Sequence, residues 1–292
     1  MNLEFAKMHG LGNDFVVFDG VRQTVDLTPE RIRALADRRF GVGCDQVLVL
    51  EPSERAGVDF AYRIYNADGG EVEQCGNGAR CVAAFARETG LTDRDLLRLT
   101  TLGGEIEPEI LADGRVTVDM GVPRLDGAEI PLTEPGEWVR APLAVDGEEH
   151  RITAVSVGNP HCVLEVPDAG AAPLEVLGPA LEHHPLFPNR ANVEFVAVEA
   201  PDRLRVRVWE RGAGVTLACG TGACAAVVAA RLWGRVGEEV TVVLDGGELV
   251  IQWAGRGSPV RMTGPAVTVF RGRLARWPDP RPATAEKGTG PF

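Results

Sequence analysis

The chain has 292 residues, of which 45% are hydrophobic, and a formal net charge of -12. A chain of this length and apolar content can bury a sizeable core, and we expect two domains of about 120 to 150 residues each. The acidic charge argues against nucleic acid or an anionic membrane surface as a partner. No basic and apolar leader opens the sequence and no run approaches about 18 apolar residues, so we expect a soluble, cytoplasmic protein.

The cysteine and lysine contents limit the cofactors that the chain can use. Its six cysteines are expected to be free thiols, because a cytosolic protein of this size rarely depends on disulfides. Their spacings are not those of a zinc knuckle, so we expect no metal. Pyridoxal phosphate needs a lysine in the active site, and the only lysines are Lys7 and Lys287. We therefore expect no cofactor.

The first half of the chain reads as short strands interrupted by two helices. Thr28 is a suitable cap for the first helix, with Pro29 at its first position. The second helix is expected at Gly76-Asn77-Gly78, where a small, apolar run begins. Strands are expected on both sides of a turn within residues 5–18, and at 47–50, 60–65, 96–102, 105–111 and 115–120.

The second half repeats this order of elements. Helices are expected around residues 178–181 and after Cys219, and strands at 138–145, 150–157, 163–166, 191–198, 204–209, 240–244 and 248–253. Residues 265–270 are expected to cross back to the first domain. The predicted domains are 1–121 plus 265–276, which carries Cys75, and 122–264, which carries Cys219. Residues 277–292 are rich in Pro, Gly, Thr and charge, and we expect them to be disordered.

Two cysteines mark an internal duplication. Cys75 and Cys219 lie 144 positions apart, and each precedes a Gly-X-Gly-Ala sequence and an apolar helical run. Other landmarks recur at offsets of 144 or 146: Asn13 with Asn159, Gln46 with Asn192, and Asn66 with Glu210. A repeat of this length indicates a duplicated half-molecule. If the two halves face each other, their helix starts can place one thiol on either side of a bound molecule.

This arrangement suggests a chemistry. A helix start exposes backbone N–H groups and positive potential, which bind anions and lower the pKa of a nearby thiol. Two thiols that face one carbon indicate a two-base proton transfer, in which one thiolate removes a proton and the opposite thiol returns one. The N–H groups of Gly76, Asn77, Gly220 and Thr221 are placed to stabilise charge on an adjoining carboxylate. Each cysteine alone is more often a core residue, but the repeated glycines favour the reactive interpretation.

Polar residues at loop ends complete the predicted site. The side chains that can hold an amino acid are Asn13, Gln46, Asn66, Asn159, Asn192 and Arg211. Arg211 is the strong cation of this set, and its planar guanidinium suits a second carboxylate.

Seven motifs resemble those of the diaminopimelate epimerase family. They are His9-Gly-Leu-Gly-Asn-Asp-Phe, Gly43-Cys-Asp-Gln, Tyr65-Asn-Ala-Asp-Gly, Cys75-Gly-Asn-Gly-Ala-Arg-Cys, Gly158-Asn-Pro-His, Trp209-Glu-Arg-Gly and Ala218-Cys-Gly-Thr-Gly, and the resemblance covers about residues 3–275. It implies an α+β fold of two pseudo-symmetric domains, each a mixed, largely antiparallel sheet wrapped around a central helix. It also implies cofactor-independent interconversion of LL- and meso-2,6-diaminopimelate, a step toward lysine and peptidoglycan.

The resemblance also implies roles for single residues. Cys75 and Cys219 would be the acid/base pair, and His161 and Glu210 would assist proton transfer. The substrate would be held by Asn13, Gln46, Asn66, Asn159, Asn192, Glu210 and Arg211, and its reacting carboxylate by the amides of Gly76, Asn77, Gly220 and Thr221. Many members have Ser at the position of Thr221, whose backbone N–H is unchanged. The family is commonly homodimeric, with an aromatic residue near the chain end at the contact, for which Phe270 is the candidate.

Other functions remain open from the sequence. A proline racemase-like enzyme would share the paired thiols but would not need Arg211, because its substrate has one carboxylate. A related isomerase with another acid/base residue is disfavoured by two intact cysteines. A thiol redox protein would cycle a Cys75–Cys219 disulfide with activity, whereas in an epimerase that disulfide would inactivate. A non-catalytic amino-acid binder would exchange no solvent deuterium into the alpha position.

Overall fold

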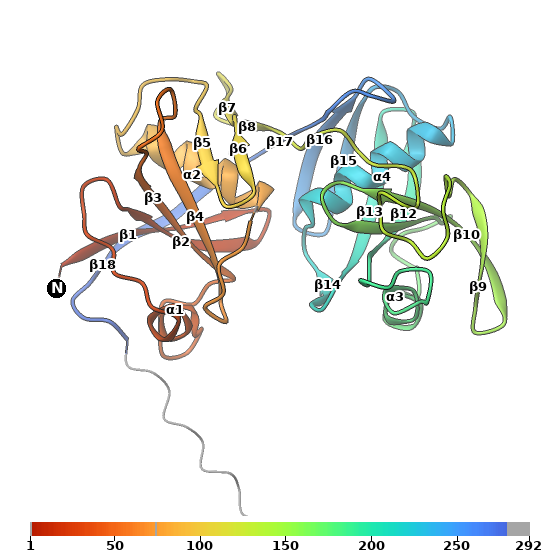
Figure 1. Cartoon of the computed structure of the whole chain (residues 1–292), viewed down its shortest axis with the longest axis horizontal. Coiled ribbons are helices and arrows are strands. Elements are labelled where there is room, and N and C mark those ends of the chain that lie inside the picture. Colours follow the sequence, from red (N-terminus) through yellow and green to blue (C-terminus); the bar gives the residue numbers. More distant parts are fainter. Residues whose placement is uncertain (1, 74, 279–292) are drawn as a thin grey trace, which may run out of the picture.

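The computed structural model describes residues 2–73 and 75–278. Within these residues the strands form two sheets, one in each of two lobes that lie side by side (Figure 1). The seven-stranded sheet of the first lobe has the order β18 (Val267–Leu274), β1 (Leu3–Gly10), β2 (Asn13–Asp19), β3 (Gln46–Pro52), β4 (Phe60–Asn66), β5 (Leu99–Thr101) and β6 (Gly104–Ile106). Its neighbours β2 and β3, and β4 and β5, run parallel, and the other neighbouring pairs are antiparallel.

The second sheet has eleven strands among the described residues. Along its main path these are β7 (Glu109–Ile110), β8 (Val116–Asp119), β17 (Val260–Gly264), β16 (Gly247–Trp253), β15 (Glu239–Leu244), β13 (Arg203–Glu210), β12 (Asn192–Ala200), β11 (Pro160–Glu165), β10 (Glu148–Ser156) and β9 (Ala141–Val145), with β14 (Gly214–Thr216) paired to β13. It too is mixed, because β11 and β12, and β13 and β15, are parallel. The α+β class and the mixed sheets are confirmed.

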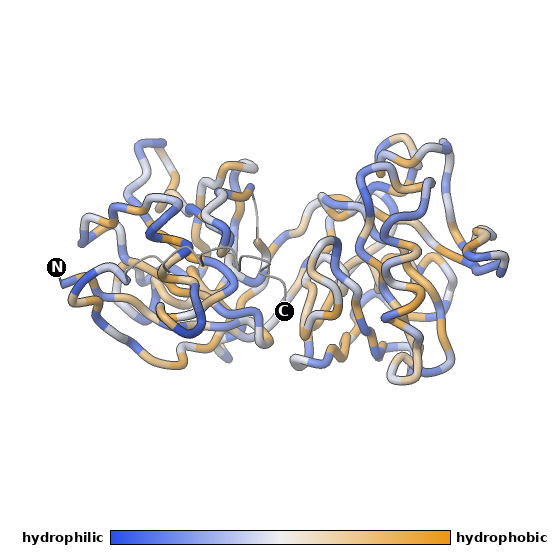
Figure 2. Tube along the Cα trace, turned by 90° about the horizontal axis from the view of Figure 1, so that it is seen from below, coloured by the Kyte–Doolittle hydropathy of each residue, from blue (hydrophilic) through white to orange (hydrophobic). Residues whose placement is uncertain are grey.

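Each lobe encloses one long helix. α2 (Gly76–Glu88) and α4 (Gly220–Leu232) are buried along nearly their whole length, and their small side chains let the strands wrap closely around them. The two shorter helices, α1 (Pro29–Ala36) and α3 (Leu174–Glu182), begin at or next to prolines on the outer side of the lobes (Figure 1). Figure 2, viewed at right angles, shows the same two lobes and the apolar character of much of their interior chain.

The chain division at residues 121 and 265 stays a prediction. β8 pairs with β17, and β7 pairs with β8 at the edge of the larger sheet, yet Val116 and Val118 of β8 pack in the core around α2. β18 crosses back to pair with β1, as expected for residues 265–270. The sequence interpretation missed β14 and β17, which are short strands, and it joined β6 and β7 into one.

The described structure extends slightly beyond the predicted start of the tail at residue 277. Trp277, placed by sequence at the start of a disordered tail, packs its ring 6.4 Å from that of Phe18 and lies under the guanidinium of Arg31. Residues 279–292, the rest of that predicted tail, lie outside the described residues. No helix in the described part of the chain is both long and apolar enough to span a membrane.

Candidate active site

Cys75 and Cys219 cap the two central helices. Each has an extended backbone, and each Sγ accepts a hydrogen bond of 3.3 Å from the third residue of its helix, Gly78 in α2 and Gly222 in α4. The Sγ of Cys219 also lies 3.5 Å from the hydroxyl of Thr221. All six cysteines are free thiols, as predicted. The two halves therefore present the same feature, a thiol on the N-terminal N–H groups of a buried helix.

The starts of α2 and α4 converge on Met262. A Cβ added to Gly76 would lie 2.8 Å from Met262 Cε, and one added to Gly220 would lie 3.0 Å from Met262 Sδ. The same Cβ on Gly220 would lie 3.3 Å from Asn77 Oδ1, so the second residue of α2 borders the first residue of α4. The glycines let both helix starts approach Met262 closely, because a side chain at either position would have to displace Met262.

Burial, not the helix start, dominates the ionisation of both thiols. It raises the pKa of Cys75 to about 11, against the opposing effects of the Gly78 N–H and the charge of Arg80. Burial also raises the pKa of Cys219 well above its usual range, and Glu210 and Glu194 add to the rise. The helix start does lower the pKa of Cys75, as expected, but burial outweighs it, because removing a thiolate from water costs more than the N–H groups of Gly78 and Asn77 return.

A buried histidine pairs with Glu194. Neither His161 nor Glu194 is exposed to solvent, and His161 Nδ1 lies 2.7 Å from Glu194 Oε1. The other ring nitrogen, Nε2, lies 2.9 Å from Oδ1 of Asn159. Burial raises the pKa of Glu194, while His161 opposes the rise. The carboxylate therefore fixes the imidazole, and the imidazole fixes the side chain of Asn159.

Glu210 ends strand β13 beside Cys219. Its carboxylate accepts a hydrogen bond from the Thr216 hydroxyl of β14, the strand missed in the sequence. Burial raises the pKa of Glu210, whereas hydrogen bonds from Thr216 and Cys219 lower it. Its charge also acts on Cys75 in the other lobe. Glu210 is thus electrostatically coupled to both thiols.

Arg211 is held by its backbone while its side chain borders a cavity. Its N–H donates to Asn192 Oδ1 at 2.8 Å, and its Nη1 donates to the carbonyl of Asn189 at 3.0 Å. The next residue, Gly212, donates its N–H to the buried Glu182 of α3. Arg211 and Asn159 line one cavity of about 480 Å³. The structure therefore brings together Asn159, Asn192 and Arg211, as the sequence predicted.

The polar residues of the first lobe form two pairs. Asn13 Oδ1 accepts from Nδ2 of Asn77 at 3.2 Å, which ties the β1–β2 turn to the start of α2. Gln46 Nε2 donates to Asn66 Oδ1 at 2.8 Å across neighbouring strands. Among the described residues, Gln46 Oε1 and Asn77 Oδ1 are buried acceptors without a hydrogen-bond partner. An ammonium or hydroxyl donor would satisfy them.

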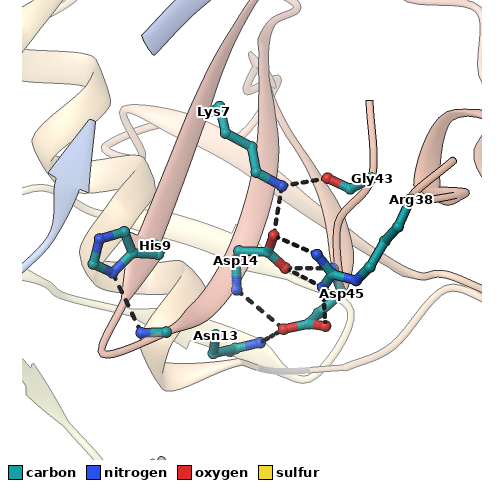
Figure 3. A network of polar contacts seen from close by, with 8 residues as sticks. Lys7, His9, Asn13, Asp14, Arg38, Gly43 and Asp45 are labelled. Atoms are coloured by element: carbon teal, nitrogen blue, oxygen red, sulfur yellow. Dashed lines mark hydrogen bonds and ion pairs between the residues drawn. The ribbon is translucent and has the colours of Figure 1, made fainter. Parts of the chain in front are cut away.

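A charged network supports Asn13 from behind (Figure 3). Asp45 accepts from Asn13 Nδ2 at 2.9 Å and from the N–H of Asp14 at 3.1 Å. Arg38 bridges the carboxylates of Asp14 and Asp45, and Lys7 Nζ donates to Asp14 at 2.6 Å. Burial of Asp14 raises its pKa, but the bonds from Arg38 and Lys7 outweigh burial and lower the pKa to about 2. Lys7 is therefore engaged in holding the turn.

The substitution D14N is expected to weaken the fold in a pH-dependent way. The folded pKa of Asp14 is about 2 against a usual 3.8, so its contribution is present above pH 4 and is lost as pH falls toward 2. Allowing for partial exposure, we expect D14N to lower the free energy of unfolding by about 1–2 kcal/mol at pH 7. Urea denaturation at pH 7 and pH 3 measures this, with D26N at an exposed carboxylate as the control. A deficit for D14N as large at pH 3 as at pH 7 would contradict the assignment.

Three supporting residues were missed from the sequence. Glu194 is a charge within the buried, apolar part of strand Asn192–Ala200, two residues from Asn192 and hence on the same face, and this was a usable signal. Asp45 lies next to Gln46 in a motif that was read only for its glutamine. Arg80 was read as part of an apolar helix, and no pattern revealed that its guanidinium is fully buried. Among the described residues no group of three or more His, Cys, Asp or Glu is arranged to hold a metal ion.

Paired thiols at converging helix starts, on a duplicated α+β scaffold, define the class of the protein as an isomerase of the racemase and epimerase type. The sequence model for diaminopimelate epimerase matches residues 5–125 and 153–269. The chain belongs to the diaminopimelate epimerase family. It is 58% identical over 274 residues to the diaminopimelate epimerase of Aromatoleum aromaticum, covering 94% of this chain and 99% of the relative. It is 56% identical over 276 residues to that of Thioalkalivibrio sulfidiphilus, with the same coverage.

Solved structures with lower sequence identity share the fold. A hydroxyproline epimerase from Agrobacterium vitis, with bound trans-4-hydroxy-L-proline, has a TM-score of 0.66 at 20% identity, covering 96% of this chain and 94% of that one. A PhzF-family phenazine biosynthesis protein from Bacillus anthracis has a TM-score of 0.68 at 16% identity, covering 94% and 99%. At such identities the likeness concerns the fold alone.

Proposed function

We propose that this chain interconverts LL- and meso-2,6-diaminopimelate, with Cys75 and Cys219 as the two acid/base groups. The observation that carries the proposal is the convergence of two thiol-capped helix starts on Met262. Relatives that are 52 to 58% identical over 94% of this chain are diaminopimelate epimerases, which supports the choice of substrate. The reaction would belong to lysine and peptidoglycan precursor biosynthesis and would need no cofactor.

The proposed reaction conserves protons and electrons. One thiolate takes the alpha proton, and the electron pair of the broken C–H bond delocalises into the adjoining carboxylate. The N–H groups of Gly76, Asn77, Gly220 and Thr221 would stabilise that charge, because they lie at the positive ends of two helices. The opposite thiol then donates its proton to the other face of the carbon. The product has the inverted centre, and the thiol and thiolate have exchanged roles.

The remaining residues would position the groups that react. Glu210 would bind the ammonium next to the reacting carbon, since its buried carboxylate acts on both thiols. His161, fixed by Glu194, would orient Asn159 and assist proton transfer beside Cys219. The distal end of the substrate would occupy the cavity lined by Asn159 and Arg211, with Asn192 holding the Arg211 turn. Asn13, Gln46 and Asn66 would complete the polar wall from the first lobe.

Incubation with LL-diaminopimelate in heavy water, without added cofactor, tests the proposal. We expect meso product that carries deuterium at the inverted alpha carbon, because the donated proton comes from a thiol in exchange with solvent. A proline racemase-like function would give turnover of L-proline instead, and the fold alone is compatible with it. The charged and amide side chains around Arg211 favour the substrate with two carboxylates. Turnover of proline without turnover of diaminopimelate would reverse the choice.

We also propose a cytoplasmic homodimer that associates through β18. This strand is the edge of the first sheet, and Val267, Val269 and Phe270 on it are exposed hydrophobic residues. The ring of Phe270 packs 6.1 Å from Phe5, which fixes it in place on that edge. Exposed apolar side chains gathered on an edge strand favour association. Sedimentation at micromolar concentration tests this, and a monomer would exclude it.

A further inference from the structure

The two thiols have like caps but unlike neighbours, and Cys219 faces negative charge. A Cβ added to Gly222 would lie 2.8 Å from Glu194 Oε1 and 3.2 Å from Cys219 Sγ, so the carboxylate and the sulfur border the same point. Glu194 Oε2 is buried with no hydrogen-bond partner among the described residues. Glu210 supplies a second carboxylate beside this sulfur.

At the equivalent point in the first lobe, the three nearest atoms among the described residues belong to no carboxylate. A Cβ added to Gly78 would lie 2.2 Å from the hydroxyl of Tyr62, 3.3 Å from Leu48 Cδ1 and 3.4 Å from Cys75 Cβ. Leu48 is the counterpart of Glu194, because each follows by two residues the polar side chain that begins its strand. The Tyr62 hydroxyl is fully buried and neutral, since burial raises its pKa. The two halves therefore differ at the residue that lies next to each thiol, which is Leu48 in the first half and Glu194 in the second.

A buried arginine breaks the symmetry further. Arg80 is fully buried, donates from Nε to the Pro265 carbonyl at 3.2 Å and contacts Met262 Sδ through Nη1 at 3.6 Å. Across residues 2–73 and 75–278 no carboxylate pairs with it, and its Nη2 has no hydrogen-bond partner. Gly10 and Gly264 make room for the guanidinium, because a Cβ on either would come within 2.9 or 3.2 Å of it. Its counterpart in α4, five residues after Cys219, is the uncharged Cys224.

We propose that Arg80 and Glu194 are positioning residues that together determine the order in which the two thiols ionise, with Cys75 losing its proton before Cys219. The inference rests on the proposed pairing of these thiols as acid and base. An arginine stays protonated at neutral pH, and its charge acts strongly across a buried, low-dielectric interior. A cation without a carboxylate partner is costly to bury, and the proposed role gives a reason for its presence.

The groups around each thiol support this order. Cys75 faces Arg80 and Cys81 on α2, Tyr62 on β4 and Glu210 on β13, whereas Cys219 faces Glu194 on β12 and Glu210 on β13. Glu210 raises the pKa of both thiols, but its influence ranks second at Cys219 and last at Cys75, so it acts in the same direction as Glu194. Arg80 lowers the pKa of Cys75, and Glu194 raises the pKa of Cys219. In the resting protein Cys75 is therefore the more acidic thiol and the first to form a thiolate.

Site-resolved alkylation of the full chain, without substrate, tests the proposal. Rate constants for iodoacetamide at Cys75 and Cys219 are measured by peptide mass spectrometry at pH 8 to 10, and each variant is compared with wild type so that differences in access cancel. In R80M we expect the rate at Cys75 to fall about tenfold, with Cys219 changing less than about twofold. In R80K, which keeps the charge, the rate at Cys75 should stay within about threefold of wild type.

E194Q acts on the other thiol and does not depend on Arg80. It should raise the alkylation rate at Cys219 about tenfold and leave Cys75 nearly unchanged, because it removes the negative charge beside that sulfur. An unchanged rate at Cys75 in R80M, an equal loss in R80K and R80M, or no gain in E194Q would each overturn the proposal. If R80M does not fold, R80K and E194Q still decide it. Since no substrate is present, failure here is distinct from failure of the proposed epimerase activity.

Discussion

Replacing Cys75 by serine is expected to lower kcat by at least about 1000-fold while leaving substrate binding nearly intact. Serine is a good helix cap, so its Oγ can accept the Gly78 N–H that Cys75 Sγ accepts at 3.3 Å. The local structure is therefore retained, but a hydroxyl ionises far less readily than a thiol and cannot act as the base. The measurement is steady-state turnover of LL-diaminopimelate, together with the affinity for substrate by calorimetry.

Two further variants make this result specific. Cys219→Ser should show the same loss, because each half-reaction needs both groups. Cys81→Ala is the matched control, since Cys81 lies fully buried on the same helix but does not cap it, and we expect its kcat to stay within about threefold of wild type. If C75S kept more than a tenth of wild-type turnover, Cys75 would not be one of the two bases, and a one-base mechanism at Cys219 would replace the proposal.

The repeat explains why much of the fold was predictable. Both central helices begin at Cys-Gly-X-Gly, where a cap, two small residues and an apolar run all indicate the same start, and the structure begins α2 and α4 at Gly76 and Gly220. The alternating strand that delivers Glu210 was also predictable from local pattern alone. Such elements are specified by their own residues, because their hydrophobic period matches their conformation.

Pairing with distant strands specifies the elements that were missed. β14 has three residues and exists because Val215 pairs with Trp209 of β13, and β17 has five residues and joins β8 to β16. Short strands of this kind have little pattern of their own, so their conformation depends on neighbours far along the chain. The membership of β7 and β8 in the larger sheet has the same origin.

The site was predictable in composition but not in electrostatics. Offsets within the repeat identified the pairs Cys75 with Cys219 and Gln46 with Asn192, since duplication preserves position in the sequence. The thiol pKa could not be predicted in this way, because burial dominates it and burial is a property of the folded lobes. The two halves differ at Leu48 and Glu194. The offsets of the repeat give no indication that these two residues make the surroundings of the two thiols unlike.

Replacing Arg211 by methionine is expected to raise KM for diaminopimelate roughly 100-fold, with kcat changing only a few-fold. The guanidinium would make two charge-assisted hydrogen bonds to the distal carboxylate, and losing them costs about 2–3 kcal/mol of binding without touching the reacting centre. The turn should persist, because the backbone N–H of Arg211 is held by Asn192 and that of Gly212 by Glu182. The KM of R211K should lie between those of wild type and R211M, since the point charge of a lysine cannot make the two parallel hydrogen bonds of a planar guanidinium.

A ligand that lacks the distal carboxylate shows whether the R211M variant has lost recognition of that carboxylate or has a damaged binding site. L-Lysine has the same chain length between amino groups but no second carboxylate, so it should inhibit wild type and R211M with equal affinity. Arg205→Met is the matched control, because Arg205 lies on β13, the strand that leads to Arg211, and pairs with Glu199 away from the cavity. An R211M variant with unchanged KM, or one that loses lysine binding as well, would show that Arg211 supports the loop and does not read the substrate. Equal lysine binding with weakened diaminopimelate binding would instead assign the choice of a two-carboxylate substrate to this side chain.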